Sequence, residues 1–227
     1  MNIFPFDGAL EEARMYMRIA GYDDFTKRDL RNLTRVMKGY LPADQYASEI
    51  VSKYLNVHGR PGDKTPAIVP NKLRTCDMAI LETAERKIFP ARLIWEFRFG
   101  PQVGFYADDL MELNRRLCGD LYCSAGELNS GISYEELGQF LSDFCRDMKS
   151  AGRDVYDICP LFQSLLCRLL EMNLFESGGM FTCMAFVSKI AYFWGFTMRF
   201  EDSGLDDIIS FTLSDRIVSQ KGCVRVA

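Results

Sequence analysis

Two apolar segments, residues 155–172 and 180–194, constrain the fold more than any other feature. The first carries leucines on every side of the helix predicted there, at positions 161, 165, 166, 169 and 170. The second is apolar almost all round until Gly195. A helix that is apolar on nearly every side has to be buried. We therefore expect 155–172 at the centre of a helical domain, with 180–194 packed beside it.

Helical patterns cover most of the remaining chain. Thr26 and Asp29 stand at capping-box spacing and predict a helix over 26–39. Its expected apolar face is Leu30, Leu33, Met37 and Tyr40. Pro90 should kink or split the pattern over 72–98, because proline removes a helical hydrogen bond. Further helices are expected over 9–21, from Pro42 to Tyr54, over 107–118 and over 133–149, with a short strand at "FTMRF", 196–200. The predicted fold class is all-α for the most part: a helical bundle with one short C-terminal strand.

The stretch "NVHGRPGDKTPAIVPNK" interrupts these patterns with three prolines and two glycines. Such a run is typical of a linker. We therefore predict a small helical module at 1–56, a linker at 57–70 and a main domain at 71–227.

The composition narrows the functional classes. The 227 residues carry a net charge of −4, and 48% of them are hydrophobic, which indicates a folded globular protein. A general nucleic-acid binder is usually basic. No run of about 18 apolar residues predicts a membrane span, and "MNIFPFDGALEE" does not resemble a signal peptide. We expect a cytoplasmic protein with neither nucleic-acid nor membrane partners.

The eight cysteines and the one histidine do not predict a metal site. No CxxC pair occurs, and His58 lies in the Gly/Pro-rich stretch. Free cysteines in a reducing cytosol account for this pattern. No metal and no cofactor are expected.

"NLFESGGMF", residues 173–181, separates the two apolar segments. Gly178 and Gly179 precede a helix, whose positive end favours an anion near its backbone N–H groups. Ser177 could add a hydroxyl, but the stretch contains no Lys, Arg or His. The chemistry alone leaves two interpretations open: a weak anion site, or a tight turn between two packed helices.

The order of several segments adds a resemblance to this picture. "NKLRTCDMAILETAERKIFPARLIWE" is similar to the pattern "NKxGIxDxxxLxxxExxxxxxRLxEL", and "LNRRLCGDLYCSAGEL" at 113–128 is similar to "IHRxLFGDVYxWAGEI". In the second, the matching residues are Leu117, Gly119, Asp120, Tyr122, Ala125, Gly126 and Glu127. About fifty residues further on comes the 173–181 stretch, and then "GFTMRF". Over most of residues 71–210 the chain thereby resembles the Fic/Doc family of protein AMP-transferases, which implies a helical Fic-like domain.

The catalytic loop departs from the family motif H-x-F-x-x-G-N-G-R. Asn173 stands where the family has the His that acts as general base, and Phe181 where it has the Arg that binds phosphate. Phe175 and Gly178 match, whereas Gly179 and Met180 replace the motif's Asn and second Gly. The family's target-binding β-hairpin has almost no room in "LNSGIS". The resemblance therefore implies a degenerate loop in which Asn173, Phe175, Glu176, Ser177, Gly178 and Gly179 retain at most backbone anion binding.

The N-terminal module resembles the antitoxin-like helices found with Fic domains. The family's inhibitory motif S/T-x-x-x-E-G corresponds to Tyr16, Ala20 and Gly21, of which only the glycine matches. The inhibitory Glu, which pairs with the motif Arg in the family, is therefore absent together with that Arg. We expect this stretch to pack near residues 173–181.

The joint loss of base, phosphate ligand, target hairpin and inhibitor predicts a chain without AMP-transferase activity and without catalytic residues of that type. The resemblance then implies a role in binding or regulating another protein, and an active Fic relative is one such partner. One alternative is a repurposed group transferase that uses a different donor and other residues, such as Glu171, Asn173 and Glu176. Another is an AMP-transferase that remains active despite the altered motif.

Overall fold

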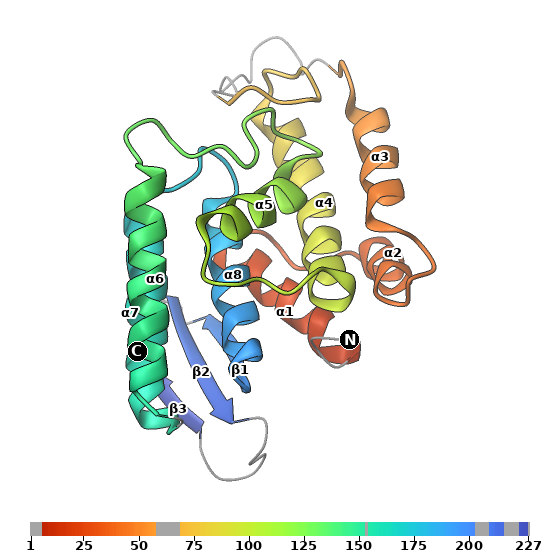
Figure 1. Cartoon of the computed structure of the whole chain (residues 1–227). Helices are drawn as coiled ribbons and strands as arrows, with labels where there is room; N and C mark the ends of the chain where they lie inside the picture. Colours follow the sequence, from red (N-terminus) through yellow and green to blue (C-terminus); the bar gives the residue numbers. More distant parts are fainter. Residues whose placement is uncertain (1–5, 58–68, 153, 203–208, 216–222, 227) are drawn as a thin grey trace. The chain divides into compact units, whose positions relative to one another are not determined.

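The structure is a computed structural model that describes residues 6–57, 69–152, 154–202, 209–215 and 223–226. The helices are α1 (Phe6–Ile19), α2 (Lys27–Met37), α3 (Ala43–Tyr54), α4 (Met78–Phe99), α5 (Ala107–Cys118), α6 (Tyr134–Ser150), α7 (Val155–Glu171) and α8 (Gly179–Phe193). The strands are β1 (Phe196–Asp202), β2 (Ile209–Asp215) and β3 (Cys223–Val226) (Figure 1). The mostly helical fold class is confirmed.

The chain forms two compact units. The first comprises Met1–Gly100 and Asn114–Gly126, and the second Pro101–Leu113 and Glu127–Ala227. The boundary differs from the one predicted at the linker 57–70, most of which lies outside the described residues. The difference arises because α1, α2 and α3 all pack against α4, so that these four helices share one core.

Helix α4 is the centre of the first unit, with α1, α2 and α3 around it (Figure 1). It continues without a break through Pro90 over 22 residues, so the predicted split is wrong, and the alternative prediction of a kink stays a prediction. Pro90 and its neighbours Phe89 and Ala91 are buried. Burial of this apolar face stabilises the helix enough to offset the one hydrogen bond that proline cannot donate.

Helix α2 begins with the predicted capping box. The Thr26 hydroxyl oxygen accepts a hydrogen bond from the Asp29 backbone N–H at 3.2 Å, and the Asp29 carboxylate accepts one from the Thr26 backbone N–H at 3.2 Å. Leu33 and Met37 are buried as expected, but Tyr40 is 75% exposed. The helix ends before Gly39, whose φ of +73° turns the chain away, so Tyr40 is no longer in register with the apolar face.

In the second unit the central helix is α8, and the expectation that residues 155–172 are central is wrong. Every side chain from Phe181 to Ala191 is buried, including the polar Thr182, Ser188 and Lys189. Helix α7 packs against α8 but buries only one face, which includes Leu165, Leu166 and Leu169. Its other face is exposed to solvent at Tyr156, Ser164, Cys167 and Arg168.

Three strands follow α8, where one was predicted. They form an antiparallel sheet in the order β1-β2-β3, with Phe200 opposite Phe211 in the register of β1 and β2. Phe196, Met198 and Phe200 are buried on β1, as their alternation predicts. Phe211 and Leu213 continue the same alternation on β2. Helix α8 packs on β1, and α7 packs on β2 and β3.

None of the helices in the described part of the chain is long and apolar enough to cross a bilayer.

Candidate functional site

The segment between α7 and α8 lies in the stretch that resembles the Fic catalytic loop. Asn173 follows the end of α7 in the left-handed conformation, with φ of +47°, and its N–H donates to the Leu170 carbonyl at 3.1 Å. Asparagine tolerates this conformation better than most residues. Asn173 thus ends α7, and its amide could not accept a proton near neutral pH in any case.

Apolar side chains fix the middle of this loop. Leu174 and Phe175 are buried, while Glu176 is exposed to solvent. Phe181, at the position of the motif's phosphate-binding Arg, is only 5% exposed. The side chains at positions 174, 175 and 181 therefore contribute to packing and present no charge to a ligand.

Asn129 holds the start of the loop from a separate segment of the same unit. Its backbone N–H donates to the Leu174 carbonyl at 2.9 Å, and its Nδ2 donates to the Asn173 carbonyl at 2.6 Å. Asn129 lies in 127–133, the segment that corresponds to the target-binding hairpin if the resemblance to the Fic family holds, and these seven residues contain no strand. Sequence reasoning missed Asn129, because nothing local links positions 44 residues apart.

Gly178 and Gly179 start α8. Gly178 is the N-cap residue, with φ of +65°, and no side chain caps the helix there. The Gly178 carbonyl accepts from the Thr182 backbone N–H at 3.0 Å and from the Thr182 hydroxyl at 2.9 Å. Close to this helix end an anion would gain only about 0.3–1 kcal/mol from the helix dipole. The first turn of α8 carries no charged side chain.

Tyr16, Ala20 and Gly21, which correspond to the family's inhibitory motif in the resemblance, belong to the first unit. Tyr16 on α1 is fully buried, with its ring edge-on to Phe97 at a centroid distance of 5.8 Å. The backbone N–H of Ala20 donates to the Tyr16 carbonyl at 3.1 Å, and Gly21 ends the turn with φ of +79°. Their expected proximity to residues 173–181 stays a prediction.

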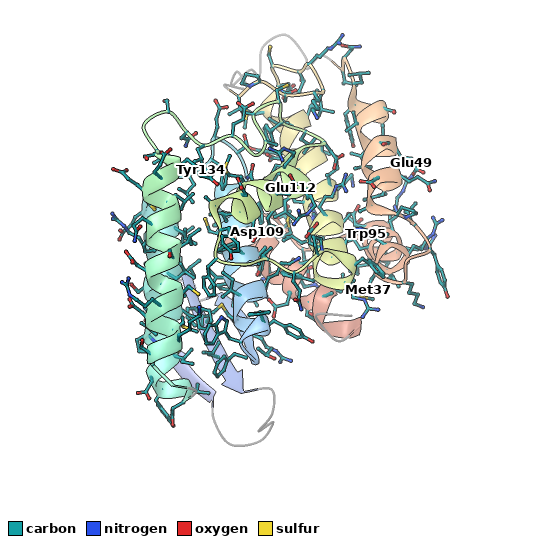
Figure 2. The ribbon with its side chains drawn as sticks, viewed as in Figure 1. Met37, Glu49, Trp95, Asp109, Glu112 and Tyr134 are labelled. Carbon is teal, nitrogen blue, oxygen red and sulfur yellow. The ribbon has the colours of Figure 1, made fainter. Side chains whose placement is uncertain are left out.

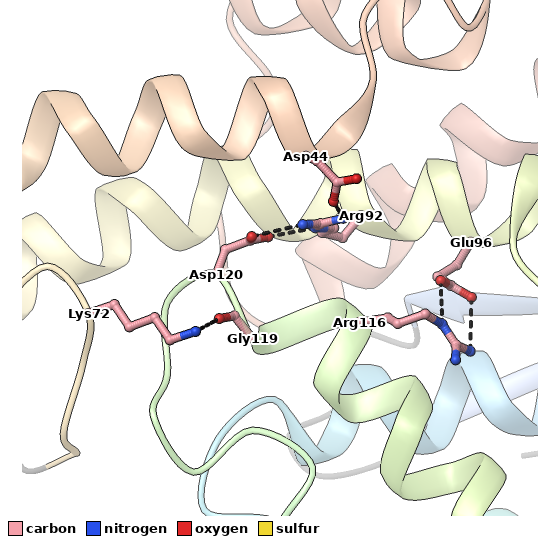
Figure 3. Close-up of polar contacts among 7 residues, drawn as sticks. All are labelled: Asp44, Lys72, Arg92, Glu96, Arg116, Gly119 and Asp120. Carbon is pink, nitrogen blue, oxygen red and sulfur yellow. Dashed lines mark hydrogen bonds and ion pairs between the residues drawn. The ribbon is translucent and has the colours of Figure 1, made fainter.

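Ion pairs of the first unit join residues 71–96 to residues 114–126, which lie in the two stretches that resemble Fic motifs (Figure 3). Arg92 on α4 donates from Nε and Nη2 to the two Asp120 carboxylate oxygens at 2.5 and 2.8 Å. Its Nη1 donates to Asp44 at 2.5 Å. Burial alone would lower the pKa of Arg92, but the bonds to Asp120 and then Asp44 outweigh it and raise that pKa.

A second polar cluster of the first unit surrounds Glu85, which is buried on α4. Tyr22 donates to its carboxylate at 2.6 Å, and Tyr122 also donates a short hydrogen bond to it. Burial first, and then the charge of Glu85, raises the pKa of both phenols. Burial likewise raises the pKa of the nearby Cys118 thiol, which makes it an unreactive cysteine. The phenols stabilise a buried carboxylate, so we assign this cluster a structural role.

No group of three or more metal-binding side chains occurs in the part of the chain that the structure describes. No protein-family model matches the sequence, and no protein of curated function matches it.

Proposed function

We propose that the chain is a Fic-like protein that lacks AMP-transfer chemistry and acts by binding another protein. The observation that carries this proposal is the burial of Phe181 in the core of the second unit. An arginine at this position would have to leave the core to reach a phosphate. The loop has neither the His base nor the Arg cation of the family motif, so the two main catalytic contributions of that motif are missing.

The partner class follows from the same resemblance. Antitoxin-like modules bind Fic domains, so an intact Fic protein is the first candidate partner. A cytoplasmic location fits this proposal, because Cys76, Cys123 and Cys167 are exposed free thiols. Light scattering of the chain mixed with an intact Fic protein would detect a stable complex.

Transfer of labelled AMP from ATP and magnesium to candidate proteins tests the loss of catalysis. We expect no labelling by the natural sequence, because the general base it lacks contributes about 10²–10⁴ in rate. Asn173→His should not label either, because the phosphate ligand is still missing. An intact Fic protein serves as the positive control. Labelling by the natural sequence that is abolished by Asn173→Ala would overturn the proposal.

Nucleotide binding distinguishes the proposal from a repurposed group transferase. Micromolar affinity requires about 8 kcal/mol, far more than one helix end supplies. Calorimetry with ATP, ADP and AMP should therefore show no binding tighter than the high micromolar range. A low-micromolar constant that is lost in Gly178→Val would favour the transferase instead.

A further inference from the structure

The outward face of α2 is strongly basic. Lys27, Arg28, Arg31 and Arg35 are all exposed, and we call these four residues the basic stripe. At 3.6 residues per turn they fall within about 100° of the helix circumference. The opposite side carries the buried residues that pack against α4.

No acidic residue of α2 neutralises this stripe. Asp29, the single carboxylate of the helix, is buried on the opposite side and pairs with Lys87 on α4 at 2.8 Å. Within the described ranges, no carboxylate forms an ion pair with any of the four stripe residues. The stripe is therefore an uncompensated patch in a chain whose net charge is −4.

Most of this arrangement also opposes the stability of α2 itself, and only Arg35, in the last turn, is favoured by the helix dipole. Other helices place opposite charges three residues apart, as in Arg14–Glu11, Arg146–Asp143 and Arg168–Glu171. In α2, like charges stand three and four residues apart at positions 28, 31 and 35, where they repel. Lys27 and Arg28 lie in the first turn, at the positive end of the helix dipole. Charged residues that destabilise their own helix without a compensating contact are typical of functional surfaces.

Aromatic side chains lie at the end of α2 and on the adjoining part of α4. Tyr40 is 75% and Phe99 45% exposed. The Trp95 ring, labelled in Figure 2, lies on the Phe99 ring at a centroid distance of 4.5 Å. The Phe99 ring also lies beside Gly39, the residue before Tyr40. A Cβ added to Gly39 would be 3.5 Å from the Phe99 Cζ. Arginine and aromatic residues are the types most enriched in the energetic centres of protein interfaces.

We propose that the basic stripe and the aromatic residues Tyr40 and Phe99 form a docking surface for an acidic segment of a partner protein. Arginine matches a carboxylate with two parallel hydrogen bonds, so charge complementarity favours such a segment. The stripe is about 12 Å long, the length of a few extended residues. The inference rests on the proposed function, in which the chain acts by binding protein, and it names the surface and the chemistry of the partner.

Fluorescence anisotropy with two labelled peptides tests the proposal. One peptide contains ten glutamates, and the other is the same glutamate peptide with a phenylalanine at its centre. We expect both to bind at low salt, and the triple variant Arg28→Glu/Arg31→Glu/Arg35→Glu to bind at least about tenfold more weakly. The matched control Lys53→Glu/Lys149→Glu/Arg199→Glu makes the same charge change at other exposed positions and should bind within about twofold of the natural protein. Tyr40→Ser should weaken only the phenylalanine peptide.

Three results would overturn the proposal: no binding of either peptide, an equal loss in the control variant, or tighter binding of a DNA duplex than of the peptides. Circular dichroism checks that the variants fold, and Arg31→Gln/Arg35→Gln replaces the triple variant if that one does not. A negative result leaves the AMP-transfer prediction intact, because that assay does not involve α2. Conversely, AMP transfer by the natural sequence would overturn the proposed function whether or not the peptides bind.

Discussion

The segment at 119–126 and the loop at 173–179 both lie in stretches that resemble Fic motifs, yet their polar side chains differ in role. In the first, Asp120 and Tyr122 match the family pattern and each has a partner on α4. In the second, Asn173 stands where the resemblance places the family's base. The backbone and side chain of Asn129 donate hydrogen bonds to this loop, and buried apolar side chains hold it as well. Asp120 and Tyr122 thus have structural partners inside the unit, whereas positions 173 and 181 differ from the motif at residues to which the resemblance assigns a chemical role.

The sharpest test of this contrast is Phe181→Arg, which restores the family residue. Phe181 is buried, so the change removes apolar burial and places a charge in the core. We expect a loss of about 4 kcal/mol or more in the free energy of unfolding. Met180→Arg, one residue earlier and half-buried, should cost about 1 kcal/mol in the same urea titration. Similar values for the two variants would mean that position 181 can release its side chain from the core.

Asp120→Ala tests the partner of Arg92. The change leaves the mostly buried guanidinium with only Asp44, whose side chain is 81% exposed. We expect a loss of about 3 kcal/mol in urea unfolding, near the lower end for breaking a buried ion pair. Glu171→Ala removes an exposed pair with Arg168 and should cost no more than about 0.5 kcal/mol. If both variants lose equally little, the ion pair at Asp120 does not hold this segment.

Tyr122→Phe removes one of the two phenols that donate to Glu85, which should cost about 2 kcal/mol near neutral pH. Burial and Glu85 raise the pKa of Tyr122, so the folded protein keeps this phenol protonated. The pKa of Tyr122 in the folded protein is raised above its unfolded value of 10.0. The group therefore contributes stability at pH values below 10.0, and this contribution is lost as the pH rises above 10.0. The variant should therefore lose less stability than the natural protein as the pH increases past about 10. Tyr156→Phe, which removes an exposed phenol hydroxyl, is the control and should cost no more than about 0.5 kcal/mol near neutral pH.

The smallest expected effect is that of Asn129→Ala, which removes the side-chain hydrogen bond to the Asn173 carbonyl and keeps the backbone bond to Leu174. We expect a loss of about 1 kcal/mol and faster hydrogen exchange at residues 173–176. Ser130→Ala, at the exposed neighbouring position, is the control. Unchanged exchange in the Asn129 variant would show that the backbone bond alone fixes the loop.

Much of the fold was predictable because caps and periodicity act locally. Thr26 and Asp29 marked the start of α2, and the alternation of Phe196, Met198 and Phe200 marked β1. Which of the two helices, α7 or α8, is the more deeply buried was not predicted correctly. The five leucines of α7 suggested burial on all sides, but its polar residues share one exposed face. In α8, tertiary packing buries Lys189 and Ser188 as well, which residue type alone would place at the surface.

The candidate site was predictable only in part. The two glycines predicted before a helix are found at the start of α8, but the left-handed conformation of Gly178 was not predicted. The bonds from Asn129, and those that join α4 to Asp120 and Tyr122, depend on long-range folding that no local pattern encodes. The exposure of Tyr40 depended on where α2 ends, and helix boundaries are the least reliable part of such predictions.

The interleaved order of the two units has a consequence for synthesis on the ribosome. Residues 114–126 complete the first unit but are translated after 101–113, which belong to the second. At about 5–20 residues per second, Tyr122 follows Glu85 by roughly 2–7 s. During that interval the nascent α4 carries Glu85, Arg92 and Glu96 before Tyr122, Asp120 and Arg116 exist to bind them. The N-terminal half therefore cannot reach its final fold until the start of the second unit has also left the exit tunnel.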